Sequence, residues 1–248
     1  MKIAIISDVH GNMEALAALR HNFDELWVLG DLVNYGPDPG SVVDFIEANA
    51  DVVVRGNHDH AIAFNEDPRC SKPFREMAHA MKQYTRSVLS HSQKQFLREL
   101  PLKYEREIEG LRVLFCHAMP SDPLFAYSPP DSAQWRPELE ESGADVLLVG
   151  HTHIPFVREF DSRIVANPGS LGQPKTGSPA ARYAVWDTTA SPSAIQLRSF
   201  EYPFEKTIEK INALPIQTEI RASLAGRPRT LGTKYRASLF TITHRPNQ

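Results

Sequence analysis

The chain has 248 residues, 42% of them hydrophobic and 23% charged, and its formal net charge is −3. This composition excludes a disordered or fibrous chain and is sufficient for a sizeable hydrophobic core. The slightly negative charge disfavours nucleic acid as the main partner, and because no apolar run approaches the ~20 residues of a transmembrane helix, we expect no membrane contact.

The cysteine content and the N-terminus indicate the compartment. Cys70 and Cys116 are the only cysteines in the sequence, too few for a disulfide framework, which suits a reducing environment. The N-terminal segment MKIAIISD is too short for a signal peptide and is predicted to be a first buried strand. We therefore expect a cytoplasmic protein.

The first part of the chain alternates short apolar runs with amphipathic stretches. Strands are predicted at 2–7, 25–30 and 51–54, separated by helices at 12–23 and 40–48. Strands that alternate with helices indicate βαβ units and a mostly parallel sheet. Because these strands are almost continuously apolar, we expect both faces of the sheet to be covered.

Residues 60–100 interrupt this alternation with a helical insertion. Helices are predicted at 74–89 and 92–100, the second with Ser92 as its N-cap. We expect the insertion to cover the cleft of the site and to influence which substrates enter it.

Strands return after the helical insertion. A hairpin is predicted from the runs 102–108 and 111–116, and a buried strand at 145–150. The proline-rich residues 118–137 are predicted to form an irregular loop. Beyond residue 150, short strands with turn signals predict a second, more antiparallel sheet that packs against the first.

The C-terminal segment differs from the rest in charge. Residues 217–248 carry six Lys/Arg against one acid, whereas the remainder holds 21 basic and 29 acidic residues. A basic tail on an acidic body lies back on that body or is solvated, and we favour these outcomes over a polyanion-binding arm. We expect one domain over residues 1–248, with the tail at about 215–248.

Five predicted strands each end in a polar cluster. The clusters are SDVHGN (7–12), GDLVNYG (30–36), GNHDH (56–60), CHAMP (116–120) and GHTHIP (150–155). In an open α/β sheet the loops after the carboxyl ends of the strands lie along one edge, so these loops are expected to converge. A single Asp or His after a strand is usually a cap or a solvated side chain, but five such loops together indicate a site.

The side chains in these loops suit metal ligation. They comprise two carboxylates, an amide and four imidazoles: Asp8, Asp31, Asn57, His10, His117, His151 and His153. One ion takes roughly four to six ligands, whereas two ions about 3.5–4 Å apart that share a carboxylate use all seven. Mixed nitrogen and oxygen donors suit Mn, Fe, Zn, Co or Ni rather than Ca or Mg.

Local geometry is also expected to serve this ligation. The donors of Asp8 and His10 alternate along the chain, as do those of His151 and His153, so each pair is expected to project from an extended segment. The glycine before Asp31 lets the backbone turn sharply.

These motifs resemble the calcineurin-like metallophosphoesterase superfamily, in particular its small bacterial and archaeal phosphodiesterase branch. The family pattern D-x-H, G-D, G-N-H-D/E, H and G-H-x-H occurs here in order over residues 1–170. Its elements are Asp8-Val9-His10, Gly30-Asp31, Gly56-Asn57-His58-Asp59, His117 and Gly150-His151-Thr152-His153. The segment NPGS at 167–170 also recurs in small members of the family.

The resemblance implies a fold and a division of the ligands. The fold is a two-sheet α/β sandwich with the site at the ends of the strands. By the same resemblance, one divalent ion is expected to be held by Asp8, His10 and His153, and the other by Asn57, His117 and His151. Asp31 is expected to bridge the two ions.

The activity that follows is hydrolysis of a phosphodiester or phosphomonoester bond in a small molecule or nucleotide. Two cations lower the pKa of a water, so that hydroxide is available near neutral pH. His58 lies on the turn after strand 51–54, next to Asn57, and we expect it to be the general acid that protonates the leaving oxygen. His60 and Asp59 are expected to be a helix N-terminus and a solvated side chain rather than part of the chemistry.

One segment departs from part of the family. The protein Ser/Thr phosphatases and the diadenosine tetraphosphatases carry Asp-Arg-Gly or a similar basic element where this chain has Asn34-Tyr35-Gly36. Asn34 can orient the imidazole of His58 but does not raise its pKa as a carboxylate does. A small-molecule or phosphodiester substrate is therefore favoured over a phosphoprotein.

Two alternatives are less favoured. A nuclease of the recombination-repair branch conflicts with the acidic body, unless the basic tail and residues 60–100 together bind DNA. A non-catalytic metal-binding scaffold of the same fold, like the retromer subunit, conflicts with the complete ligand set and with His58.

Overall fold

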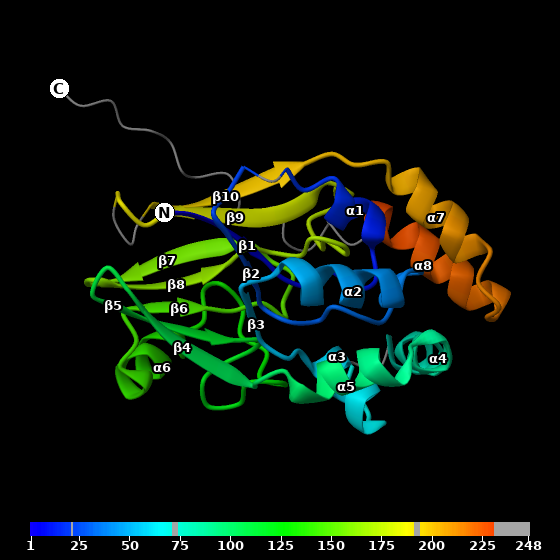
Figure 1. Ribbon diagram of the computed structural model, residues 1–248, viewed down its shortest axis with the longest axis horizontal. Helices are drawn as coiled ribbons and strands as arrows, with labels where there is room; N and C mark the ends of the chain where they lie inside the picture. The colour runs from blue at the N-terminus through cyan, green and yellow to red at the C-terminus, as the bar shows by residue number, and fades with distance from the viewer. Residues whose placement is uncertain (21, 71–73, 191–193, 231–248) are drawn as a thin grey trace.

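The computed structural model describes residues 1–20, 22–70, 74–190 and 194–230, which form two mixed five-stranded sheets with helices around them (Figure 1). The strand order is β10-β9-β1-β2-β3 in the first sheet and β4-β5-β6-β8-β7 in the second. The predicted α/β fold with two sheets is confirmed.

The first sheet combines strands from both ends of the described chain. Its strands are β1 (Lys2–Ile6), β2 (Glu25–Val28), β3 (Val52–Val53), β9 (Ala181–Asp187) and β10 (Ile195–Phe200). The first three strands are parallel and are connected by α1 (Met13–Ala17) and α2 (Pro39–Asn49). Strand β9 pairs antiparallel with β1, and β10 pairs antiparallel with β9. The first helix is shorter than predicted because the chain must return to the sheet, where the Asp24 N–H donates to the Lys2 carbonyl at 2.7 Å.

The second sheet consists of β4 (Lys103–Ile108), β5 (Leu111–Cys116), β6 (Val146–Leu148), β7 (Phe156–Phe160) and β8 (Arg163–Asn167). Strands β5, β6 and β8 are parallel, and β4 and β7 pair antiparallel at the edges. The predicted division of strands was wrong. The hairpin β4–β5 belongs to the second sheet, and β9 and β10 belong to the first, because β9 pairs with β1 rather than with the strand before it.

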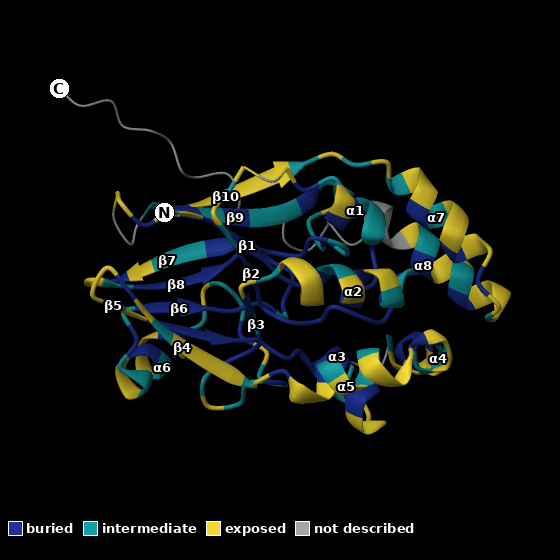
Figure 2. Cartoon of the chain, viewed as in Figure 1, coloured by how far each residue is buried: buried dark blue, intermediate teal, exposed yellow. Residues whose placement is uncertain are grey.

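The two sheets pack face to face over a hydrophobic core. Along β1, Ile3 and Ile5 point into the layer between the sheets, whereas Ala4 and Ile6 point to the outer cluster with residues of α1 and α2. Trp27 of β2 contacts Phe115 of β5 across this layer, with ring centroids 4.9 Å apart. The central strands β1, β2, β5, β6 and β8 are therefore largely buried, as Figure 2 shows in dark blue, whereas much of the edge strands β4 and β10 is exposed.

Three helices occupy the predicted helical insertion: α3 (Asn57–Phe64), α4 (Arg75–Val88) and α5 (His91–Glu99). The N-cap of α5 is Ser90 rather than Ser92. The Ser90 hydroxyl accepts the Gln93 N–H at 3.1 Å, and the Gln93 side chain accepts the Ser90 N–H at 3.0 Å, which is a complete capping box. Most of 118–137 is irregular as predicted, but α6 (Trp135–Ser142) begins inside it.

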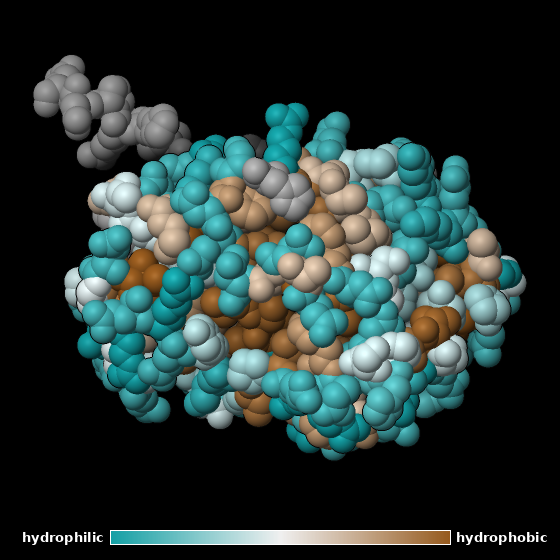
Figure 3. Space-filling view, in the orientation of Figure 1, coloured by the Kyte–Doolittle hydropathy of each residue, from teal (hydrophilic) through white to brown (hydrophobic). Residues whose placement is uncertain are grey.

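Two C-terminal helices were not predicted: α7 (Phe204–Asn212) and α8 (Thr218–Thr230). Ile211 of α7 and Leu224 of α8 join Met77 and Met81 of α4 in a buried cluster that also includes Tyr35. The first part of the predicted basic tail therefore packs on the body, and residues 231–248 lie outside the described part of the chain. On the face shown in Figure 3, hydrophilic side chains surround a hydrophobic area in the middle. No helix of the described residues is long and apolar enough to cross a bilayer.

Candidate active site

All seven predicted donor side chains come together at one edge of the two sheets. They follow the carboxyl ends of β1, β2, β3, β5 and β6. Six of them are buried, and His151 is partly buried. The convergence arises because parallel strands β1, β2 and β3 of one sheet and β5 and β6 of the other end at the same side of the sandwich.

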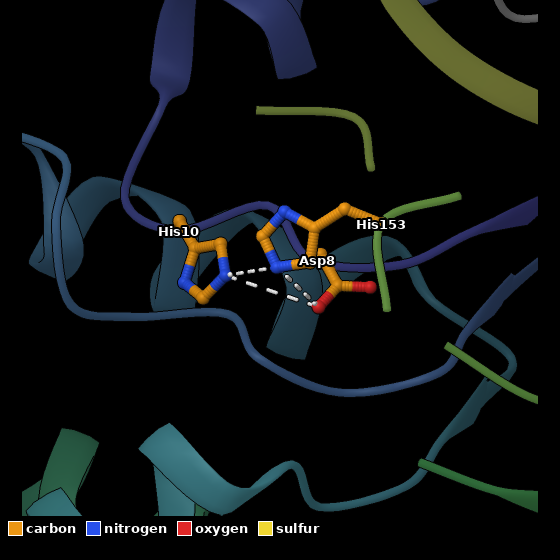
Figure 4. Close-up of side chains that lie close together, drawn as sticks. All are labelled: Asp8, His10 and His153. Carbon is orange, nitrogen blue, oxygen red and sulfur yellow. Dashed lines mark hydrogen bonds and ion pairs between the residues drawn. The ribbon is translucent and has the colours of Figure 1, made fainter. Parts of the chain in front are cut away.

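The first group consists of Asp8, His10 and His153 (Figure 4). The Nε2 atoms of His10 and His153 lie 3.2 Å apart, and Asp8 Oδ1 lies 3.2 Å from His153 Nε2. The Nδ1 atoms of His10 and His153 face the carbonyls of Val33 and Gln173 at 3.1 and 2.6 Å. Because a carbonyl only accepts, each Nδ1 carries the proton and each Nε2 presents a lone pair.

The second group surrounds Asp31. His117 Nε2 lies 3.3 Å from Asp31 Oδ2 and 3.2 Å from His151 Nδ1. Asn57 Oδ1 lies 3.2 Å from His117 Nε2 and 3.1 Å from His151 Nδ1. The Nδ1 atom of His117 faces the Leu29 carbonyl at 2.7 Å, which again directs the Nε2 lone pair inward.

Asp31 connects the two groups. Its Oδ2 atom lies 3.7 Å from His10 Nε2 in the first group and 3.3 Å from His117 Nε2 in the second. Asp8 Oδ1 is buried and has no hydrogen-bond partner among the described residues. The nitrogen and oxygen lone pairs of these side chains face one another in a buried place, and too few protons lie between them to form hydrogen bonds. Such an arrangement is unfavourable unless cations bind between the lone pairs. The residues present therefore fit a pair of metal ions.

The electrostatics of the histidines follow from burial and from the two carboxylates. Burial alone lowers the pKa of His117, but the nearby carboxylates of Asp31 and Asp8 outweigh it and raise that pKa to about 9. Burial lowers the pKa of His151 to about 3, and the charge of His117 adds to this effect. Burial would raise the pKa of Asp8, but His153 holds it below its ordinary value.

His58 lies beside these groups at the start of a helix rather than on the predicted turn. Asn57 and His58 are the first two residues of α3. The His58 N–H donates to Asp31 Oδ1 at 2.8 Å, and its Nδ1 atom lies 2.7 Å from the Asn34 amide nitrogen. Burial lowers the pKa of His58 to about 4, although Asp31 opposes the shift.

Asp59 lies beside the site and contacts the loop that carries Asp31, which was not expected from the sequence. It is fully buried, not solvated, and its carboxylate accepts the N–H groups of Asp31, Leu32, Val33 and Gly56 at 2.7–3.3 Å. Burial, and then the charge of Asp31, raise the pKa of Asp59 to about 7. The signal was present in the sequence, because Asp59 closes the G-N-H-D motif.

The ligand-bearing segments are not extended as expected. Asp8 and His10 have φ values of 54° and 48°, and His151 and His153 have 65° and 61°, all in the left-handed region. This geometry turns the chain sharply at each donor. It is uncommon for residues other than glycine and is concentrated at functional sites.

The NPGS segment supports the first group. The Ser170 hydroxyl donates to the Asp8 carbonyl at 2.7 Å, and the Asn167 amide donates to the Gly150 carbonyl at 2.6 Å. The Ser7 hydroxyl donates to Asp8 Oδ2 at 2.6 Å. These bonds orient Asp8 and the loop that carries His151.

Comparison with known proteins gives consistent results. The calcineurin-like phosphoesterase superfamily domain matches residues 1–191. An uncharacterised protein of Methanocaldococcus jannaschii is 33% identical over 236 residues, which cover 86% of this chain and 93% of that protein. The phosphodiesterase YfcE of Escherichia coli is 26% identical over 199 residues, or 73% of this chain and 85% of that one.

A solved structure shows the same fold. The crystal structure of a metallophosphoesterase from Sphaerobacter thermophilus superposes with a TM-score of 0.75 at 28% sequence identity. The superposition covers 94% of this chain and 99% of the other.

Proposed function

The chain belongs to the calcineurin-like phosphoesterase superfamily, and on that premise we propose that it uses two divalent metal ions to hydrolyse phosphodiester or phosphomonoester bonds. The substrates proposed are small phosphorylated molecules, nucleotides included. The observation that carries this proposal is the convergence of two buried groups of nitrogen and oxygen donors on the shared carboxylate of Asp31.

The proposed ligand assignment follows these two groups. Asp8, His10 and His153 hold one ion, Asn57, His117 and His151 hold the other, and Asp31 contacts both. Such ions, when bound, supply a water of lowered pKa and neutralise charge on the phosphoryl oxygens. Manganese is the ion to test first, and Fe, Zn, Co and Ni suit the same donors.

The chain's own residues position the ester and assist the leaving group. The backbone N–H of His58 donates to Asp31, which fixes the His58 backbone beside the shared carboxylate, and the Asn34 amide contacts its imidazole. We assign to His58 the hydrogen bond to the leaving oxygen. Burial of the donors excludes bulk water and strengthens each electrostatic contact.

A segment of the helical insertion borders the site. The Pro68 carbonyl accepts from the Asn57 amide at 2.7 Å, and Cys70 Sγ lies 3.7 Å from His58 Nε2. We propose that this segment influences which substrates reach the ions. Cys70→Ala is expected to change the ratio of diester to monoester turnover, and an unchanged ratio would speak against this role.

A phosphodiester is the preferred bond class, since YfcE, similar over most of this chain, is a phosphodiesterase. The test is to strip the purified protein of metal, restore Mn²⁺, and assay bis-p-nitrophenyl phosphate and p-nitrophenyl phosphate side by side. Diester hydrolysis is expected to dominate. Monoester activity alone would indicate a phosphatase, and silence on both substrates with two ions bound would contradict the proposal.

His58→Ala tests the assigned role in the same assay. The kcat is expected to fall by about 100-fold or more, with two ions retained. His91→Ala is the matched control, because His91 is exposed at the start of α5. An unchanged kcat in the His58 variant would show that the assignment is wrong.

A further inference from the structure

The side chain of Asn34 contacts His58 in a way that fixes the position of a proton. Asn34 is fully buried, and its Nδ2 atom lies 2.7 Å from His58 Nδ1. Asn34 stands where other branches of the family have a carboxylate. An amide nitrogen only donates hydrogen bonds, so opposite Asn the imidazole nitrogen must accept. A carboxylate only accepts, so opposite Asp or Glu the same imidazole nitrogen must donate.

The orientation of the Asn34 amide is determined by two backbone groups. Its Oδ1 atom accepts the Tyr35 N–H at 3.1 Å, and its Nδ2 atom donates to the Ala78 carbonyl at 3.4 Å. If the amide were turned by half a rotation, Nδ2 would face the Tyr35 N–H and Oδ1 would face the Ala78 carbonyl. Both contacts would then be repulsive, so Nδ2 is the atom that faces His58.

The tautomer of His58 follows from this contact. Because Nδ1 accepts a hydrogen bond from Asn34, it carries no proton, and the ring proton lies on Nε2. Nε2 lies 3.7 Å from Cys70 Sγ, a weak acceptor that an ester oxygen can replace. The ring packs beside Tyr35 and His10, with centroids 4.8 and 5.2 Å away.

We propose that Asn34 is a positioning residue that holds His58 in the Nε2–H tautomer and thereby selects substrates with good leaving groups. This inference rests on the proposed function. A neutral imidazole that gave up its Nε2 proton completely would become an imidazolate, so it supplies a hydrogen bond and not a full proton. When the phosphorus–oxygen bond breaks, the leaving oxygen keeps the electron pair and departs as an anion.

The chemical class of the substrate follows from this requirement. Aryl oxides and phosphates are stable as anions, and alkoxides are not. Among phosphodiesters, the site therefore favours those whose leaving group is an aryl oxide, or the phosphate of a nucleotide, over simple alkyl esters. A carboxylate at position 34 would accept a proton from Nδ1 instead, so that His58 could hold a proton on each nitrogen and transfer the one on Nε2 to an alkoxide.

Asn34→Asp is the variant that reverses the contact. Asp has nearly the same shape, and it tolerates the left-handed backbone of residue 34, where φ is 73°. Asn49→Ala is the control, because Asn49 is exposed and bonds only to the Phe45 carbonyl of its own helix among the contacts of the described residues.

The first measurement is the tautomer itself. Long-range ¹H–¹⁵N spectra of the ¹⁵N-histidine-labelled, zinc-loaded protein are assigned by comparison with His58→Gln. The wild type is expected to show His58 protonated on Nε2 alone, and Asn34→Asp is expected to show a proton on Nδ1. A wild-type signal with Nδ1 protonated would overturn the inference.

The second measurement is the dependence of kcat/KM on the leaving group, using aryl methyl phosphates from p-nitrophenyl to phenyl. The ratio of phenyl to p-nitrophenyl turnover is expected to rise about tenfold or more in Asn34→Asp, and to stay unchanged in Asn49→Ala. Equal ratios in the wild type and Asn34→Asp would overturn the selection of leaving groups. If the wild type, with two ions bound, hydrolyses neither these diesters nor p-nitrophenyl phosphate, the proposed function is wrong, and the spectrum still decides the tautomer.

Discussion

Gly56 packs so closely against Asp31 that even the methyl group of alanine at position 56 would displace the carboxylate of Asp31, which both donor groups share. A Cβ atom at position 56 would lie 2.1 Å from Asp31 Oδ1 and 2.3 Å from the Asp31 backbone nitrogen. Contacts below 3.0 Å essentially never occur for a real Cβ. Rotation of the carboxylate relieves only the first contact, so the Asp31 backbone itself must move by several tenths of an ångström.

The expected effect of Gly56→Ala is a loss of metal and of rate rather than of fold. The φ of Gly56 is −87°, which alanine adopts without strain, so the steric contact is the only perturbation. Overpacking costs about 1–3 kcal/mol of stability. A displacement of about 1 Å at the reacting groups lowers the rate on the order of 100-fold.

The assay combines metal content by atomic emission with kcat/KM for bis-p-nitrophenyl phosphate. Gly226→Ala is the matched control, because a Cβ at that position of α8 meets no atom of the described residues within 4 Å. If Gly56→Ala stays folded and keeps both ions and the wild-type rate, Asp31 does not have the place assigned to it between the two groups.

Three further outcomes are expected. The pKa of His117 in the metal-free protein is raised to about 9, so below that pH a metal ion must displace the His117 proton in order to bind. The apparent metal affinity should therefore rise with pH toward 9, by at most about tenfold per pH unit for this proton. Calorimetry that showed no pH dependence of the affinity would refute this. Asp59→Asn places an amide N–H donor against backbone N–H groups, so each lost hydrogen bond should lower the free energy of unfolding by about 1–3 kcal/mol. This loss is measured as a lower melting temperature. An unchanged melting temperature would show that Asp59 does not hold these loops. Chelation of the ions should also lower the melting temperature, since they bind the folded state, and addition of Mn²⁺ should restore it.

The convergence of the donor side chains was predicted from the sequence, whereas the assignment of strands to the two sheets was not. To predict that the donors converge, it was sufficient that successive parallel strands end at the same edge of a sheet. This holds for β1, β2 and β3 and does not depend on how the later strands pair. The assignment of strands to sheets depended on a distant pairing, that of β9 with β1, which no local pattern encodes. Helices α7 and α8 were not predicted, because burial of a few residues such as Ile211 and Leu224 against other parts of the fold stabilises them.

The direction of hydrogen bonds was the other feature that sequence could not supply. Asn34 was recognised as a replacement for an acid, but only the Tyr35 N–H and the Ala78 carbonyl show which end of its amide meets His58. Ala78 comes from α4, more than forty residues away along the chain.

The backbone strain at the donors explains why the surrounding network is so dense. Non-glycine residues in the left-handed region cost on the order of 1–3 kcal/mol each and persist only where their surroundings fix them. Asp8 is such a residue, and it is held by the Ser170 hydroxyl and, through its side chain, by Ser7. Asp31 is another, and its N–H donates to Asp59 at 2.7 Å. We therefore expect residues that hold the loops, such as Asp59 and Ser170, to be important to the site, because their hydrogen bonds oppose relaxation of the strained backbone.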